Sequence, residues 1–258
     1  MNVHILARKL RSVFQVLRYP RFAGIKFRAF GMLSPKVYAR IYEATMRGPD
    51  LDVLEIGAAR GAATIVIAKA LLSSEKRAKV VAVEKFSGGS NVDFGGKDEN
   101  LARIRALFDF YGVTDKVTIF AHYLTGENAE EVKALISTEQ IGLLLIDADG
   151  RLDVHLPLVW SRLSSDCPII LDDYRENYDF ALRSERFPLG RTKELTCFRL
   201  VNRLRDLGYL KIESIVSNTV FARKARSGSF SESDRTALRE EVSSVEREYE
   251  AWLERQRS

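Results

Sequence analysis

Four aspartates follow two apolar runs in the middle of the chain. Asp147 and Asp149 come just after the run at residues 141–146, and Asp172 and Asp173 come just after the run CPIIL. Carboxylates that gather without partners repel one another and raise each other's pKa. A hard divalent cation such as Mg²⁺, which binds carboxylate and water oxygens, relieves this repulsion. The pattern therefore indicates a cation site formed by these acids.

A helix cap is the alternative role for a single acid of this group. Aspartate is a favoured residue just before the first turn of a helix, where its carboxylate accepts a backbone N–H group. Asp149 has this position relative to the helix expected from about Arg151. One acid in such a role is compatible with the cation site, whereas four acids in cap positions would leave no site.

A second group of residues able to bind a ligand surrounds a glycine turn. The stretch at residues 51–70 predicts a buried strand, a tight turn and a helix that opens near Gly61. Gly57 permits the sharp turn, and Gly61 permits close approach by a ligand or by the next helix. The free N–H groups at the helix start favour a polar or anionic ligand group. Glu55, just before the turn, is able to receive an ammonium or a hydroxyl.

The spacing Glu-x-Gly-x-x-x-Gly differs from the Gly-x-Gly-x-x-Gly of dinucleotide-binding proteins, because Ala58 and Ala59 occupy the middle. A second apolar run, residues 80–83, ends in Glu84, near the ~20-residue offset at which an acid binds a ribose in doubly wound folds. The two features together favour a nucleoside cleft. A glycine turn alone would equally fit an α/β connection without a ligand.

Alternating strands and helices must position these residues. Besides the runs already named, strands are expected at residues 53–56 and 117–120, and a hairpin at 209–216 and 219–223 around Ser217-Asn218. Helices are expected at about 35–46, 61–72, 99–111, 128–136, from 151, and at 194–207. This order predicts a parallel sheet with helices on both faces. Because ligands of such sheets bind at the carboxyl ends of strands, the acids and the glycine turn are expected to converge.

The chain resembles the class I S-adenosylmethionine-dependent methyltransferases from about residue 50 to residue 224. Glu55, Gly57 and Gly61 match the first motif of that family, and Glu84 matches its ribose acid. The resemblance implies an α/β fold with a doubly wound, seven-stranded, mostly parallel sheet that ends in an antiparallel hairpin. It implies S-adenosylmethionine as the cofactor, and it adds three residues to the cofactor site: Ala58, His122 and Asp147.

The acids make the resemblance to a known family more specific. Asp147, Asp172 and Asp173 look like the metal-binding acids of the cation-dependent O-methyltransferases, and the first two lie 25 residues apart. The pair Asp-x-Asp and Asp-Asp-Tyr is more similar to the macrocin O-methyltransferase branch, which methylates sugar hydroxyls. This resemblance implies that the three acids bind Mg²⁺ or another divalent cation and that Asp149 is the general base. The sequence departs from the pattern at Gly150, where relatives often carry histidine or lysine.

The leading expectation is a cation-assisted O-methyltransferase that acts on a hydroxyl of a sugar or another small polyhydroxylated or glycosylated acceptor. In such a reaction the cation stabilises the alkoxide and a carboxylate takes the proton, while the protein aligns oxygen, methyl and sulfur. One alternative is a metal-independent small-molecule methyltransferase whose acids bind a substrate amine. Another is a non-catalytic protein that uses the methyltransferase fold for assembly.

Composition and charge divide the 258 residues into three expected parts: a basic N-terminal helical lid at 1–48, a methyltransferase domain at 49–226, and a linker with an amphipathic helix at 227–258. The 46% hydrophobic content suits a globular core, and no apolar run approaches the ~20 residues of a membrane span. Two cysteines, Cys167 and Cys197, are expected to be reduced thiols of a cytoplasmic protein.

The formal net charge of +5 is concentrated at the N-terminus, since residues 1–40 contain many basic residues and no acid. Apolar residues at helical spacing run through the same stretch. The segment is expected to act as a lid, or to contact an anionic membrane surface or a phosphate-bearing substrate. Nucleic acid is not an expected partner, because no recognised motif accompanies the basic residues.

Two further segments bear on substrates and partners. Residues 175–195 are a candidate substrate-covering loop, with Arg183, Arg186 and Arg191 able to meet acidic groups. In the last helix an apolar seam recurs at intervals of 4, 3, 4 and 3 residues, as in a coiled coil. The seam predicts either a homo-oligomer or packing on the domain, and its members are Leu238, Val242, Val245, Tyr249 and Trp252.

Overall fold

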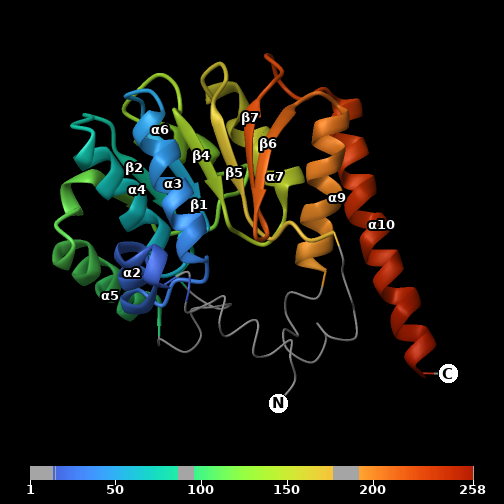
Figure 1. Cartoon of the computed structure of the whole chain (residues 1–258). Coiled ribbons are helices and arrows are strands. Elements are labelled where there is room, and N and C mark those ends of the chain that lie inside the picture. Colours follow the sequence, from blue (N-terminus) through green and yellow to red (C-terminus); the bar gives the residue numbers. More distant parts are fainter. Residues whose placement is uncertain (1–13, 15, 87–95, 177–191, 258) are drawn as a thin grey trace.

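The computed structural model describes residues 14, 16–86, 96–176 and 192–257. Within these residues the centre of the molecule is a seven-stranded sheet in the order β3-β2-β1-β4-β5-β7-β6 (Figure 1). Within the run β3-β2-β1-β4-β5 each strand is parallel to its neighbours, and β7 pairs antiparallel with both β5 and β6. The predicted fold class, a mostly parallel sheet with a terminal hairpin, is confirmed. The strands are β1 Val53–Ile56, β2 Val80–Val83, β3 Val117–Phe120, β4 Leu143–Ile146, β5 Pro168–Leu171, β6 Leu210–Val216 and β7 Thr219–Lys224.

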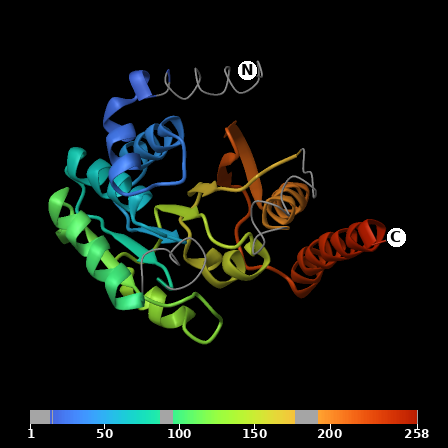
Figure 2. The same ribbon diagram turned by 90° about the horizontal axis from the view of Figure 1, so that it is seen from below.

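Helices cover both faces of the sheet, as Figure 2 shows from below. They are α2 Pro20–Arg28, α3 Pro35–Arg47, α4 Ala62–Ser73, α5 Lys97–Phe110, α6 Ala129–Leu135, α7 Leu152–Val159, α9 Lys193–Asp206 and α10 Glu232–Arg257. Short 3₁₀ turns lie at Thr114–Lys116 and Trp160–Arg162.

Successive residues of the central strands enter different cores. Leu144 and Ile146 of β4 belong to the core cluster that contains residues of α6, α7, α9 and α10. Leu143 and Leu145 belong to the cluster with α2, α3, α4 and α5. Since side chains alternate across a strand, a strand covered on both faces must be apolar throughout. This explains why β1, β2 and β4 are unbroken apolar runs apart from Glu55.

The register of the parallel strands brings the carboxyl ends of β1, β4 and β5 to one level. Ile56 at the end of β1 pairs with Ile146 of β4, and Ile146 pairs with Leu171 of β5. The residues that follow these strands therefore leave the sheet side by side. The glycine turn, the Asp147 strand end and the Asp172 strand end meet at this edge, as the sequence predicted.

The strand expected from Ile141 is shorter than predicted. Ile141 forms only an isolated bridge with Leu163, and β4 begins at Leu143. At Gly142 a Cβ atom would lie 2.8 Å from the Leu51 Cβ and 3.0 Å from the Leu51 carbonyl oxygen. The Ile141 N–H donates to the Arg162 carbonyl at 2.7 Å, so this residue pairs with the connection after α7 and not with a neighbouring strand. The other predicted elements within the described residues agree with the structure to within about two residues.

The N-terminal basic stretch packs partly into the domain. Ile25 of α2 and Val37, Tyr38 and Ile41 of α3 are buried in the core cluster that includes α4. Residues 1–13 and 15, which carry much of the expected amphipathic pattern, lie outside the described residues. Contact with a membrane surface or a phosphate group through this segment therefore stays a prediction. Among the described helices, none combines the length and hydropathy needed to cross a bilayer.

The C-terminal helix packs on its own chain. Leu238 and Val245 of α10 are fully buried, and Val242 is nearly so. Just before the helix, the ring of Phe230 stacks on Tyr209 with centroids 4.0 Å apart. The first half of the apolar seam is thus covered by α9 and α7 and is not accessible to a second copy. Self-association through the remainder of α10 stays a prediction.

Candidate active site

The glycine turn follows β1 and leads into α4. Gly57 has a φ of +91°, and its N–H donates to the Val83 carbonyl at 2.9 Å. A Cβ atom at Gly57 would lie 2.2 Å from the Asp147 carbonyl oxygen. Any other residue would strain the backbone and collide with the end of β4. Gly57 is therefore the point at which the turn touches the acidic strand end.

Gly61 packs closely against the next helix. Its φ is +77°, and a Cβ atom there would lie 2.9 Å from the Phe108 ring of α5. The sequence left open whether a ligand or the next helix approaches this glycine. In the structure α5 approaches it, and cofactor binding by Gly61 stays a prediction.

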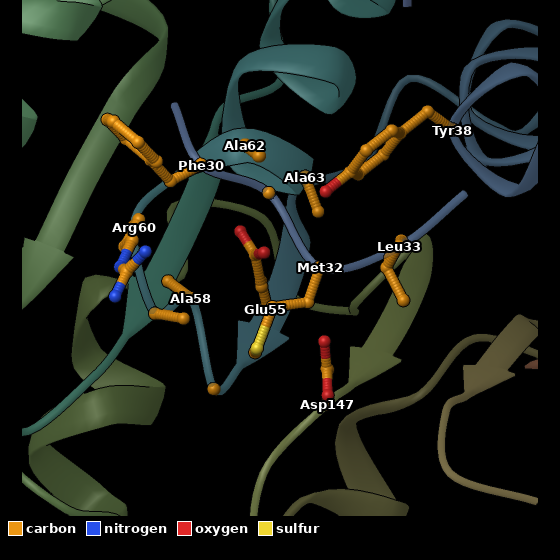
Figure 3. A pocket seen from close by; sticks show the side chains of 13 residues that line it. Phe30, Met32, Leu33, Tyr38, Glu55, Ala58, Arg60, Ala62, Ala63 and Asp147 are labelled. Atoms are coloured by element: carbon orange, nitrogen blue, oxygen red, sulfur yellow. The ribbon is translucent and has the colours of Figure 1, made fainter. Parts of the chain in front are cut away.

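A cavity opens beside the turn, and Figure 3 shows its lining. The carboxylates of Glu55 and Asp147 and the hydroxyl of Tyr38 surround it, with Ala58 at the turn. Three of the predicted cofactor residues that carry side chains thus line one cavity. Its far wall comes from the connection between α2 and α3.

This covering segment, residues 30–33, was not predicted to take part in the site. The Lys26 ammonium holds it by donating to the carbonyl oxygens of Gly31, Met32 and Leu33 at 2.8, 3.1 and 2.7 Å. A Cβ atom at Gly31 would lie 2.2 Å from the Tyr38 hydroxyl oxygen, so the segment packs tightly on α3. The signal in the sequence was a glycine shortly before the helix start at Ser34, but it did not indicate what the segment covers.

Glu55 is buried at the end of β1, with 1% of its surface exposed. The Thr64 hydroxyl donates to its carboxylate at 2.6 Å. Burial raises the pKa of Glu55 to about 8, although the Thr64 hydrogen bond opposes this. A buried carboxyl of this kind binds a cationic group well, because the cation stabilises the ionised form.

Glu84, the predicted ribose acid, lies at the end of β2 and is half-buried. Its carboxylate accepts the N–H of Ala59 at 2.8 Å and the N–H of Phe86 at 3.2 Å. It therefore holds the turn, and each oxygen keeps acceptor capacity for a ligand hydroxyl. Ribose binding by Glu84 stays a prediction.

His122 lies outside the part of the site described so far. It follows β3 at the edge of the sheet, is exposed, and contacts the ring of Phe120 with centroids 5.3 Å apart. It is not among the described residues that line the cavity. A role in cofactor binding stays a prediction for this residue.

Asp147, Asp172 and Asp173, which we call the acid trio, come together at the ends of β4 and β5. Each offers a carboxylate oxygen within 4.8 Å of the others. Burial and the neighbouring carboxylates raise the pKa of Asp147 and raise that of Asp172 to about 6. The Thr219 hydroxyl donates to Asp172 at 2.5 Å. The convergence of these three acids is confirmed, and their donor set fits a hard divalent cation.

An ammonium that the sequence did not point to also reaches the acid trio. Lys193, the first residue of α9, places its Nζ 2.5 Å from Asp173 Oδ2 and 3.8 Å from Asp147 Oδ1. Burial alone would lower the pKa of Lys193, but the carboxylates together raise it above the ordinary value. In the sequence Lys193 stands in a charged stretch without period, which gave no sign of its target.

Asp149 is not part of the acid trio. It is exposed, accepts a hydrogen bond from the Tyr123 hydroxyl, and accepts the N–H of Arg151 at 3.2 Å. The helix α7 begins at Leu152 without a side-chain cap, so Asp149 forms a turn before the helix rather than a cap. The role of general base stays a prediction. The segment with Arg183, Arg186 and Arg191 lies outside the described residues.

Comparisons with known proteins agree with this geometry. Residues 54–174, which include the glycine turn and the acid trio, match the model of a methyltransferase domain. No curated protein matches the chain. The fold is similar to that of several methyltransferases of known structure.

Three of these structures are informative at the level of the fold. The S-adenosylhomocysteine-bound methyltransferase PaMTH1 of Podospora anserina has a TM-score of 0.60 at 15% identity, over 88% of this chain and 97% of that one. Cofactor-bound Rv0187 from MTB has a TM-score of 0.55 at 14% identity, over 81% and 91%. An O-methyltransferase from Bacillus cereus, in complex with SAH, has a TM-score of 0.51 at 15% identity, over 83% and 90%.

The strand order and the matched domain define a class I methyltransferase fold. The chain carries a methyltransferase domain at residues 54–174, in agreement with the enzyme class that its motifs predicted, and it shares its fold with structures that hold S-adenosylhomocysteine. The narrower likeness to the macrocin O-methyltransferase branch stays a prediction.

The first test concerns the contact between Gly57 and Asp147. We expect Gly57→Ala to abolish the rise in melting temperature that S-adenosylhomocysteine gives the wild type. Gly112→Ala is a matched control, because Gly112 also has a positive φ, of +61°, but a Cβ atom there meets nothing within 4 Å. Both variants carry backbone strain, and only one carries the collision. Equal ligand shifts in the two variants would contradict the assignment of the turn to the cofactor.

The second test concerns the proton held by Glu55. Because its pKa rises from 4.5 unfolded to about 8 folded, the folded protein keeps a proton that the unfolded chain loses over this window. The contribution of Glu55 to the free energy of unfolding therefore becomes less favourable as the pH rises from about 4.5 to about 8. A ligand ammonium bound beside Glu55 would favour the ionised carboxylate and release this proton.

We expect S-adenosylhomocysteine to release up to about one proton at pH 7. Calorimetric titrations in two buffers that differ in ionisation enthalpy measure this number. The isosteric variant Glu55→Gln should bind without this release. If Glu55→Gln released as many protons as the wild type, the ligand ammonium would lie elsewhere.

Proposed function

We propose that this methyltransferase transfers the methyl group of S-adenosylmethionine to a hydroxyl of a small polyhydroxylated or glycosylated acceptor, with a divalent cation held by the acid trio. One observation carries the proposal. Asp147 belongs to the acid trio and also lines the cavity beside the glycine turn. A cation on the trio and a cofactor in the cavity would therefore be neighbours, as methyl transfer to a cation-bound oxygen requires.

The choice of an oxygen acceptor rests on the chemistry of the site. Oxygen ligands of three carboxylates favour a hard cation, and a hard cation in turn favours a hydroxyl or alkoxide as its substrate ligand. The fold is similar to that of the O-methyltransferase from Bacillus cereus. The pair Asp-x-Asp and Asp-Asp-Tyr supports a sugar hydroxyl, through the resemblance described above.

One group of residues would bind the cofactor, and another would activate the acceptor hydroxyl. Glu55, Glu84 and the turn would hold the cofactor so that its sulfonium faces the acid trio. When bound, the cation would lower the pKa of the acceptor hydroxyl and stabilise the developing alkoxide. Asp149 would take the hydroxyl proton, with the Tyr123 hydrogen bond fixing the orientation of its carboxylate. Since the sulfonium methyl is already activated, alignment of oxygen, carbon and sulfur is the main remaining task.

A second candidate is a metal-independent methyltransferase. The Lys193 ammonium favours it, because this group already neutralises part of the charge of the acid trio. In this case Lys193 would donate a hydrogen bond to the acceptor, and the acids would bind polar groups of the substrate.

The formation of S-adenosylhomocysteine from a panel of glycosides and phenols, with Mg²⁺ or with excess chelator, separates the two candidates. We expect turnover to stop in chelator and to return with Mg²⁺. Asp172→Asn should lower the rate about a hundredfold or more, because it removes a cation ligand but no part of the cofactor cavity. Binding of S-adenosylhomocysteine should survive in that variant.

Asp166→Asn is the matched control, since Asp166 is an exposed acid beside β5 that pairs with Arg223. It should be as active as the wild type. Full turnover in chelator would contradict the cation-assisted mechanism and support the second candidate.

A further inference from the structure

The ammonium in the acid trio reaches it through space left by a glycine. A Cβ atom at Gly150 would lie 2.8 Å from the Lys193 carbonyl oxygen and 3.2 Å from its Cγ. Gly150 has a φ of +79°, so the turn after β4 both bends away and lacks a side chain where α9 begins. The backbone and stem of Lys193 fill this space. Packing therefore fixes the backbone and the base of the Lys193 side chain, whereas its Nζ is held by the ion pairs with the acid trio.

The start of α9 does not depend on the Lys193 ion pairs. The next residue, Glu194, has its own ion pair with Arg175 at 3.2 Å. Leu195 and Cys197 are buried, and Cys197 donates its thiol to the Asp172 carbonyl at 3.0 Å. These contacts hold the helix against the strand ends. The Lys193 side chain is thus able to change its position without loss of the helix.

Lys193 and a divalent cation need the same atoms. The ammonium lies against one oxygen each of Asp173 and Asp147, and these two residues are also members of the candidate cation site. Two positive charges a few ångströms apart repel strongly in a partly buried site. They therefore exclude each other from the full set of carboxylates.

We propose that Lys193 is a built-in competitor of the divalent cation, so that the acid trio holds either the ammonium or the metal ion. The inference rests on the cation site of the proposed function and adds how its occupancy is set. With the ammonium in place, solvent cations do not reach the full set of carboxylates, and the three acids stay close together without a metal ion. Binding of the cation requires the Lys193 side chain to swing out, so the apparent affinity is reduced by the fraction of molecules in which it lies inward.

Binding of Mn²⁺, measured by calorimetry and by the loss of the free-ion paramagnetic resonance signal, tests this without any methyl transfer. We expect Lys193→Met to bind Mn²⁺ at least about tenfold more tightly than the wild type, because the competing charge is removed. Lys193→Arg, which keeps the charge, should bind as weakly as the wild type. Lys133→Met is the matched control, since Lys133 pairs with Glu130 on α6, away from the acid trio.

A second readout keeps the test valid if the variant is unstable. Without its ammonium the acid trio should repel itself, so Mn²⁺ should raise the melting temperature of Lys193→Met more than that of the wild type. Lys193→Gln, which keeps a hydrogen-bond donor without charge, should show the same larger rise in melting temperature as Lys193→Met.

The outcomes distinguish this inference from the proposal on which it rests. Equal Mn²⁺ affinity in the wild type and in Lys193→Met, with binding lost in Asp172→Asn, would overturn the competition and leave the cation site intact. No Mn²⁺ binding by any variant would overturn both the competition and the cation-assisted mechanism. Tight binding by Lys193→Met that disappears in the double variant with Asp147→Asn would support the competition at this site.

Discussion

The close approach of Gly57 to the Asp147 carbonyl is the constraint on which the rest of the site depends. It exists because β1 and β4 are parallel neighbours in register, with the Asp147 N–H donating to the Ile56 carbonyl at 2.9 Å. The turn that lines the cavity is thereby pressed against the strand end that carries the first acid of the trio. A side chain at position 57 would separate them. The cavity beside the turn and the acid trio are therefore two sides of one contact.

A group of buried carboxyl groups is the second organising feature. Glu55 and Asp147 both line the cavity, and burial is the first cause of the raised pKa of each. Such a site favours ligands that bring positive charge, since a cation stabilises the ionised carboxylates. A sulfonium, an amino-acid ammonium and a divalent cation all meet this requirement. Lys193 meets it from within the chain.

The sequence predicted the fold well because its strands are buried on both faces and so are visible as unbroken apolar runs. It predicted the acid trio for a related reason: parallel strands end at one edge, so acids that follow two strands must meet there. The error at Ile141 has the opposite cause. An apolar residue that pairs with a connecting segment looks the same in a sequence as one that pairs within the sheet.

What the sequence did not predict depends on contacts between distant segments. Lys193 reaches the trio because α9 begins beside Gly150, and residues 30–33 cover the cavity because Lys26 and the packing on α3 hold them there. Neither placement leaves a local pattern. The apolar seam of α10 is ambiguous in another way, since the same spacing serves a coiled coil and a helix packed on its own domain. The burial of Leu238 and Val245 answers this for the first half of the helix.

The central claim is that the cofactor cavity and the acid trio meet at Asp147. A crystal structure with S-adenosylhomocysteine and Mn²⁺, in which the anomalous signal locates the metal, measures this most directly. The account predicts the amino-acid part of the ligand between Glu55 and the segment 30–33, the ribose beside Glu84, and the sulfur facing the trio. A ligand bound away from the glycine turn, or with its sulfur directed away from Asp147, would contradict it.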